Sequence, residues 1–127
     1  MWEVEYTHEF EERSGALSVE QQEALDDRVM LLAEHGPDLK RPVVAEILSS
    51  RHSRMKELRV SRAGALRVLF VFDPRRHAIL LLGGDKTGQW SEWYTTAIPA
   101  ADELYDTHLI ELKAEGLLEG SLEQEDK

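Results

Sequence analysis

Apolar residues in the middle of the chain gather in three runs of strand length, which cover residues 55–60, 65–72 and 77–82. Two short polar turns separate the runs, the first containing a glycine and the second a proline. Runs rich in Val, Leu, Ile and Phe that are joined in this way predict an antiparallel meander. Because residues 65–72 lie between the two turns, we expect them to form an interior strand of the sheet.

Arg67 interrupts the apolar run of the second predicted strand. Side chains alternate along a strand, so Arg67 lies on the face opposite to that of its two sequence neighbours. A charge at this position requires a partner or a solvent-filled groove, because burying an unpaired charge is costly. Arg59 and Lys86 are placed to share its face or rim, which predicts a basic surface on one side of the sheet. The structural alternative is an arginine that pairs with Glu57 or Asp73.

The N-terminal part of the chain predicts a strand, a loop and a helix. Apolar and acidic residues alternate over residues 2–6, which is typical of a half-exposed strand, and the polar residues 7–15 predict a loop. Ser18 and Gln21 have the spacing of a capping box, and apolar residues at helical spacing follow them. Gly36 is expected to end this helix, because the proline that follows it cannot continue one.

The segments that flank the meander carry weaker signals. Residues 42–48 fit either a short helix or an extended segment, and the proline at the first position favours the helix. Pro99 suits the first turn of a last helix, which carries an apolar stripe and is expected to end near Gly116. We expect the acidic residues 118–127 to be a frayed tail.

Length and composition limit the classes of protein that remain. A chain of 127 residues fits one domain, so we expect a single α+β domain over residues 1–127, with an antiparallel sheet of about four strands and helices packed on one face. The absence of cysteine excludes disulfides and thiolate metal sites, and the five histidines lack metal-binding spacing, so no cofactor is expected. No apolar run reaches the roughly 18 residues of a membrane span, so we expect a cytoplasmic protein with no membrane contact.

The charge of the chain is divided unevenly along the sequence. The net charge is −10, which at first sight argues against binding to nucleic acid. Residues 35–90, however, contain eleven Lys or Arg against five Asp or Glu, whereas each flank carries ten acids against two cations. A basic centre attracts phosphate at short range, since exposed charges beyond a Debye length of about 8 Å are largely screened. On charge alone, a solvated charged surface is an equally good interpretation.

These residues resemble the HigB-like, phage-derived branch of the RelE/ParE toxin superfamily. The resemblance rests on a strand ending in Glu-Leu-Arg, a strand with Arg-Val-Leu-Phe and an exit of Gly-Gly-Asp-Lys, and it covers nearly the whole chain except the tail. The matching segments are Arg41-Pro42, Ser50-Arg51-His52, Met55 to Arg59, Leu66 to Arg76, Leu80 to Lys86, Trp93-Tyr94 and Ile98-Pro99.

The resemblance implies a toxin of a type II toxin–antitoxin system. In that family the toxin enters the ribosomal A site and cuts mRNA, with the 2′-hydroxyl of the RNA as nucleophile and no metal. It further implies an antitoxin with a helix-turn-helix, which is encoded by a neighbouring gene. Operator DNA would be bound only through this antitoxin. The chain departs from the family in one respect, because such toxins are commonly basic overall.

Site residues follow from the resemblance and from the predicted strands. A concave basic sheet can stabilise the charge that the scissile phosphate gains, so Arg67, Arg59 and Lys86 are the catalytic candidates. Candidates for RNA backbone contact are Arg51, His52, Arg54, Lys56, Arg75, Arg76 and His77, for which solvated loops are the alternative. Lys56 lies on the opposite face from Arg59 if the strand is regular.

Three functions remain open from the sequence. The first is a ribosome-dependent mRNA endonuclease, which the basic centre favours. The second is a ParE-like toxin that inhibits gyrase through protein contacts. The third is an inactive partner-binding domain of the same fold, which the acidic flanks favour.

Overall fold

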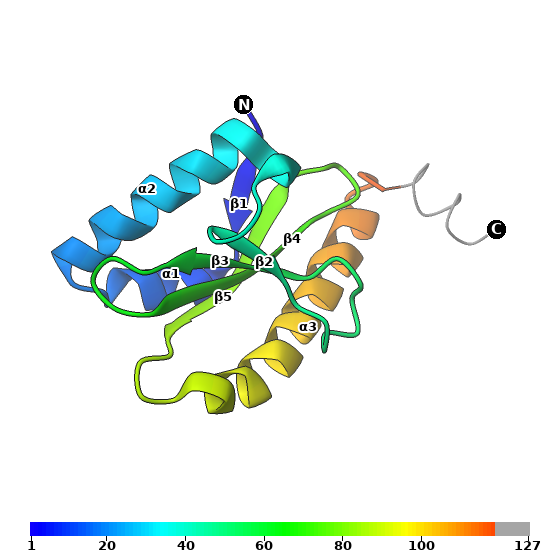
Figure 1. Cartoon of the computed structure of the whole chain (residues 1–127). Helices are drawn as coiled ribbons and strands as arrows, with labels where there is room; N and C mark the ends of the chain where they lie inside the picture. The colour runs from blue at the N-terminus through cyan, green and yellow to red at the C-terminus, as the bar shows by residue number, and fades with distance from the viewer. Residues whose placement is uncertain (119–127) are drawn as a thin grey trace.

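A five-stranded sheet with three helices makes up the computed structural model, which describes residues 1–118 (Figure 1). The strands are β1 (Val4–Tyr6), β2 (Val44–Glu46), β3 (Lys56–Val60), β4 (Leu66–Phe72) and β5 (Ala78–Asp85). The helices are α1 (His8–Gly15), α2 (Val19–His35) and α3 (Trp90–Ala114), with a 3-10 turn, η1 (Gly36–Asp38), after α2. The expected single α+β architecture is confirmed, with five strands where about four were expected.

The central meander is confirmed. The sheet order is β1-β5-β4-β3-β2, and β3, β4 and β5 pair antiparallel to one another. β4 is therefore an interior strand, as the sequence predicts. The sheet is mixed, because β1 pairs parallel to β5.

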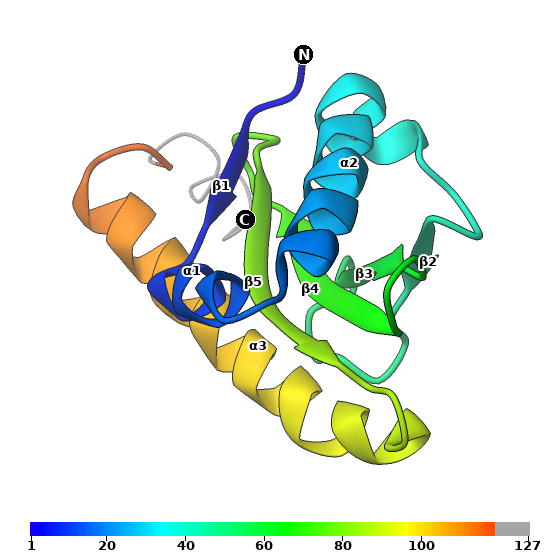
Figure 2. The ribbon, with the colours of Figure 1, turned by 90° about the vertical axis from the view of Figure 1, so that its left-hand side faces the viewer.

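Helices cover both faces of the sheet, which corrects the expectation of helices on one face. Figure 2 shows α2 and α3 on opposite sides of the sheet. One core lies between the sheet and α1 and α2, around Phe10, Leu32 and Phe70. The second lies under α3, around Leu69 and Ile79. Both faces of β4 and β5 carry apolar side chains, and each such face has to be covered by another layer.

The N-terminal segment contains a helix that the sequence analysis missed. Residues 8–15 form α1 rather than a loop, with Thr7 as N-cap accepting a hydrogen bond from the backbone of Phe10. Phe10 is buried, and a single apolar anchor in eight residues gives no periodic signal. The capping box of Ser18 with Gln21 at the start of α2, and the end of that helix at Gly36, are confirmed.

Two other local predictions are wrong. Residues 44–46 form the edge strand β2, not a short helix, because Val44 and Ala45 are buried in pairing with β3. The last helix begins at Trp90, so Pro99 lies inside it. Pro99 is exposed, and the apolar stripe of Trp93 and Ala97 continues past it against the sheet.

The C-terminal end of α3 lies close to its predicted position. Glu115 caps the helix and Gly116 adopts a positive φ of 76°. Leu118 is buried, so the exposed tail does not begin at this residue; residues 119–127 of the predicted tail lie outside the described residues. None of the helices within residues 1–118 combines the length and hydropathy needed to cross a bilayer.

Candidate functional site: a basic cluster beneath α3

The three catalytic candidates come together at one end of β3, β4 and β5. Arg59 and Arg67 are directly opposite each other in the antiparallel register of β3 and β4. Lys86 follows β5, and its backbone N–H donates to the carbonyl of Ala65, next to the start of β4. We call Arg59, Arg67 and Lys86 the basic cluster. The strand alternation and the meander therefore predicted this grouping, whereas the catalytic role of the three residues stays a prediction.

One buried carboxylate serves both arginines of the cluster. Oε1 of Glu57 lies 3.2 Å from Nε of Arg67 and 3.6 Å from Nε of Arg59. Neither Nε atom makes a well-aligned hydrogen bond within the described part of the chain, so the pairing is electrostatic rather than a bidentate fork. The guanidinium of Arg67 donates from Nη1 to the carbonyl oxygen of Leu66 at 2.9 Å.

Tyr94 on α3 closes the cluster from above. Its hydroxyl donates to Oε1 of Glu57 at 2.8 Å, and Nζ of Lys86 lies 5.0 Å from the centre of its ring. Tyr94 is not among the site residues that the sequence predicts. It is 37 positions from Glu57 in sequence, and no local pattern gives such a contact.

Burial and neighbouring charges shift the pKa of Lys86 in the basic cluster and the pKa of Tyr94 beside it. Burial lowers the pKa of Lys86, and the positive charge of Arg67 lowers it further, against the opposing effect of Glu57. Burial and the hydrogen bond to Glu57 raise the pKa of Tyr94, so its hydroxyl remains a donor at neutral pH. A lysine with a lowered pKa transfers a proton more readily near neutrality than an ordinary surface lysine does.

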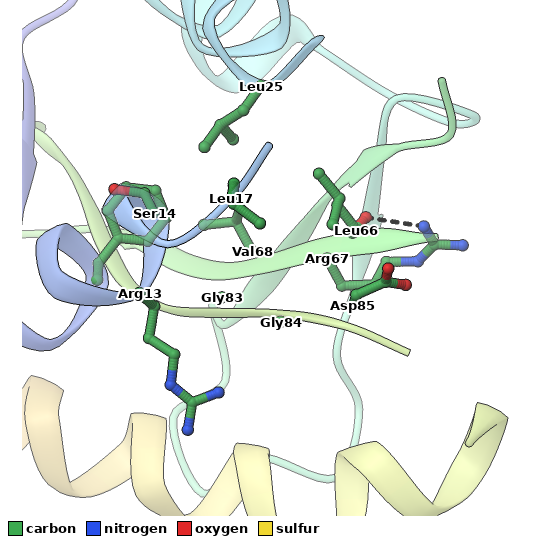
Figure 3. Close-up of a pocket in the computed structure, with 11 residues that line it drawn as sticks. Arg13, Ser14, Leu17, Leu25, Leu66, Arg67, Val68, Gly83, Gly84 and Asp85 are labelled. Carbon is green, nitrogen blue, oxygen red and sulfur yellow. Dashed lines mark hydrogen bonds between the residues drawn. The ribbon is translucent and has the colours of Figure 1, made fainter. Parts of the chain in front are cut away.

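The cluster is largely shielded from solvent in this structure. Arg67 is 8% exposed and Lys86 9%, because the first half of α3 lies over this end of the sheet. Trp93 of α3 packs so closely on Gly84 that a Cβ atom there would lie 2.4 Å from its Nε1. An apolar hollow with a volume of about 160 Å³ lies on the opposite face of the sheet, where Leu66 and Val68 belong to the first core, and Arg67 is among its lining residues (Figure 3). The side chain of Arg67 is thus ion-paired and buried beneath α3, and the hollow lies across the sheet from Glu57.

Four of the seven predicted RNA-binding residues are held in ion pairs that join distant segments. Arg51 and His52 both contact the carboxylate of Asp106 on α3. Arg75 and His77 both contact Glu5 of β1. Each of these contacts ties a loop to a helix or strand, so these side chains stabilise the arrangement of the elements in this conformation.

The other three predicted RNA-binding residues surround a second basic region, at the far end of β4 from the basic cluster. Arg54, Lys56 and Arg76 line a hollow of about 310 Å³, which Glu46 and Asp73 line as well. Nζ of Lys56 lies 5.7 Å from the ring of Phe72, on the sheet face that carries the first core, so Lys56 lies opposite to Arg59 as the alternation predicts. Lys40 and Arg41, which the sequence analysis did not select, line an adjoining hollow with Lys56.

Asp73 organises the turn that carries part of this second region. Its carboxylate accepts hydrogen bonds from Arg75 and from Nε2 of His108 on α3, the latter at 2.9 Å. Burial raises the pKa of Asp73, but the hydrogen bonds from His108 and Arg75 outweigh burial and hold it below its ordinary value. Within residues 1–118, no group of three or more His, Cys, Asp or Glu side chains is arranged to hold a metal ion.

The fold of the chain is shared with solved structures. Two solved structures of the Escherichia coli toxin RelE share the fold: a mutant in the free state has a TM-score of 0.58 at 11% identity, and the isolated toxin has a TM-score of 0.55 at 14% identity. The alignments cover 77% and 78% of this chain and 95% and 97% of those chains. These likenesses show that the chain has the fold of RelE.

The family is shown by sequence similarity. The model of the Gp49-like phage-derived proteins (DUF891) matches residues 14–106, so the chain belongs to that family. Two proteins of Mycobacterium tuberculosis (strain ATCC 25618 / H37Rv) are similar to it: “Putative toxin HigB2” is 45% identical over 67% of this chain, and “Putative toxin HigB3” is 47% identical over 69%. The match spans 43% of the length of HigB2 and 76% of that of HigB3.

Proposed function

We propose that this protein is the toxin of a type II toxin–antitoxin system and acts as a metal-independent, ribosome-dependent mRNA endonuclease. The observation that carries the proposal is the pairing of Arg59 with Arg67 around one carboxylate, with Lys86 at their side. The similarity to proteins named as toxins supports the class of protein. The cluster supports the chemistry, because it concentrates positive charge where a phosphate would have to bind.

The proposed reaction uses the basic cluster together with Glu57 and Tyr94, which contact it. The 2′-hydroxyl of the RNA attacks the adjacent phosphorus, its proton passes to Glu57, and the bond to the 5′ oxygen of the next nucleotide breaks. The leaving oxygen takes a proton from Lys86 or Tyr94, and a 2′,3′-cyclic phosphate remains. Arg59 and Arg67 neutralise the charge that the phosphoryl oxygens gain during attack.

The proposed reaction requires the cluster to open. Because Glu57 is 4% exposed and hydrogen-bonded by Tyr94, a phosphate reaches Arg67 only after the first half of α3 shifts. In the closed arrangement of this structure, the carboxylate of Glu57 neutralises Arg59 and Arg67. During the reaction the RNA phosphate takes over this role. Closure then limits cleavage by the free protein, and binding to the ribosome selects the open state.

RNA contact outside the cluster is assigned mainly to the second basic region. Arg54, Lys56 and Arg76 form its predicted part, and the structure adds Lys40 and Arg41. Such side chains position a nucleic acid through its phosphates without reading its sequence. The remaining predicted residues, Arg51, His52, Arg75 and His77, contribute less, because their carboxylate partners compete with phosphate.

The proposed partners are the ribosome with its mRNA and an antitoxin with a helix-turn-helix, encoded by a neighbouring gene. Operator DNA is bound only through the antitoxin, and the protein acts in the cytoplasm. These assignments rest on the family resemblance and on the names of the similar proteins.

Translating ribosomes supply the direct test of the proposed function. We expect the purified protein to cut mRNA in a translation reaction but not to cut the same mRNA without ribosomes. Arg67→Ala is expected to abolish the cutting, whereas Arg62→Ala, which removes an exposed arginine paired with Asp27, is the matched control. Intact mRNA together with trapped gyrase–DNA complexes would instead identify the ParE-like function, and neither effect would identify an inactive domain.

A further inference from the structure

The outer surface of α1 and α2 is strongly acidic. Residues 8–35 carry eight Asp or Glu against Arg13 and Arg28. All eight acidic residues are exposed, namely Glu9, Glu11, Glu12, Glu20, Glu23, Asp26, Asp27 and Glu34. This surface repels nucleic acid, because a phosphate backbone would have to approach like charge. The outer surface of α1 and α2 is therefore unsuited to the RNA binding that we propose for the basic regions.

A groove with an apolar floor runs between α1 and α2 within this acidic surface. It has a volume of about 330 Å³, and Phe10, Val29 and Leu80 contribute to its floor. Tyr6 also lines it and is 55% exposed, with its ring centre 5.9 Å from that of Phe10. Phe10 and Leu80 are buried at the bottom of the groove, so Tyr6 supplies most of its accessible apolar surface, which is suited to an apolar side chain of a partner.

Acidic residues, but no cations, line the same groove. Glu11 and Asp26 are its charged lining residues, and neither forms an ion pair within residues 1–118. Arg13, the cation of α1, points away from the labelled apolar side chains toward α3 (Figure 3). Ser14 and Leu25 line both this groove and the hollow of Figure 3, so the apolar region continues toward β4 and β5.

We infer that the groove between α1 and α2 binds a polypeptide segment of the antitoxin in which an apolar side chain is flanked by Lys or Arg. The inference deepens the proposed function and rests on it for the identity of the partner. The apolar side chain enters between Phe10 and Val29, and the flanking cations meet Glu11 and Asp26. Charge complementarity of this kind speeds association and excludes partners of the wrong sign.

The test uses the full chain and the product of the neighbouring gene, purified as a complex. Glu11→Lys combined with Asp26→Lys reverses both charges of the groove, and Glu11→Gln combined with Asp26→Asn removes them with little change of shape. Glu111→Lys combined with Glu115→Lys, both exposed at the end of α3, is the matched control for overall charge. Affinity is measured by titration calorimetry at two salt concentrations, and the melting temperature of each variant is recorded.

We expect the double reversal to weaken the complex by about tenfold or more and the neutral pair to weaken it less, with the control unchanged. The affinity of the parent should fall as salt rises, and that of the neutral pair should fall less steeply. Equal affinities for the parent and a well-folded double reversal would overturn the inference, as would a parent that forms no complex with this product.

Growth arrest and mRNA cutting are measured separately on the free chain, so the two proposals fail differently. A chain that arrests growth but binds its partner independently of Glu11 and Asp26 loses only the groove assignment. A chain that binds through the groove but cuts no mRNA retains the docking surface and loses the enzymatic proposal.

Discussion

Nε of Arg67 lies 3.2 Å from Oε1 of Glu57 on the sheet face that α3 covers. The same oxygen accepts the hydrogen bond of Tyr94 and faces Arg59. One carboxylate therefore holds two strands and a helix together, and it also occupies the place where a substrate phosphate would have to bind. Stability and the proposed catalysis thus depend on the same few atoms.

Arg67→Ala is predicted to relieve the growth arrest that the protein causes when it is expressed without its partner. Loss of one preorganised donor commonly lowers a rate by about 10²–10³, which is visible as restored growth and as uncut mRNA. Arg67→Lys should retain little of the mRNA-cutting activity, because an ammonium group cannot present two donors in the planar fork of a guanidinium. A folded Arg67→Ala protein that cuts mRNA as fast as the parent would transfer the chemistry to Arg59 and Lys86.

Glu57→Gln is predicted to destabilise the fold by about 3 kcal/mol, since removing one partner of a buried pair leaves uncompensated charge. Arg59 and Arg67 then face each other across the strands without a counter-ion. The free energy of unfolding in urea measures the effect, with Glu46→Gln on the exposed edge of β2 as control. Unchanged stability would mean that solvent already screens the two guanidinium groups.

Gly84→Ala is predicted to destabilise the protein by about 1–3 kcal/mol, because the new methyl group overlaps the indole of Trp93. Gly15→Ala is the control, as its Cβ would meet no atom within 4 Å. Tryptophan fluorescence should change together with the melting temperature in the Gly84 variant alone. Equal melting temperatures for both variants would show that α3 shifts away from the sheet at little cost.

The contacts of Asp73 predict a loss of stability in acid. Its folded-state pKa lies below the ordinary value, so the unfolded chain takes up the proton first as pH falls. The stabilising contribution is complete well above about pH 4 and is lost as the pH falls through the folded-state pKa. Unfolding free energies from about pH 7 to about pH 2.5 should decline less steeply for Asp73→Asn than for the parent.

Asp38→Asn, at an exposed position in η1, serves as the control for that pH series. Its decline should follow that of the parent. A parent curve that coincides with the Asp73→Asn curve would show that His108 and Arg75 do not stabilise the ionised carboxylate.

Local sequence pattern predicted the parts of this fold that local forces determine. The three-strand meander and the α2 capping box follow from side-chain alternation and from a contact that spans three residues. β2 and α1 were missed, since pairing with β3 decides the first and the burial of Phe10 decides the second. The sequence predicts the start of α3 at Pro99 because proline is favoured at the first position of a helix, but packing of Trp93 against Gly84 extends the helix before it.

The candidate site divides in the same way. Arg59, Arg67 and Lys86 were brought together by strand geometry, which is readable from alternation and turn length. The bond from Tyr94 to Glu57 and the contacts of Arg51 and His52 with Asp106 join residues 37 to 55 positions apart. Such contacts depend on the angle at which α3 crosses the sheet, and this angle cannot be predicted from the pattern of a single sequence.

The two glycines at the end of β5 leave this part of the sheet without side chains on either face. A Cβ atom at Gly83 would lie 3.4 Å from the ring of Phe10 on α1, and one at Gly84 would meet Trp93 on α3. The two helical layers are consequently separated here by the thickness of one peptide backbone. A displacement of α1 at the groove between α1 and α2 is therefore transmitted to α3, the helix that covers Arg67, through this single backbone.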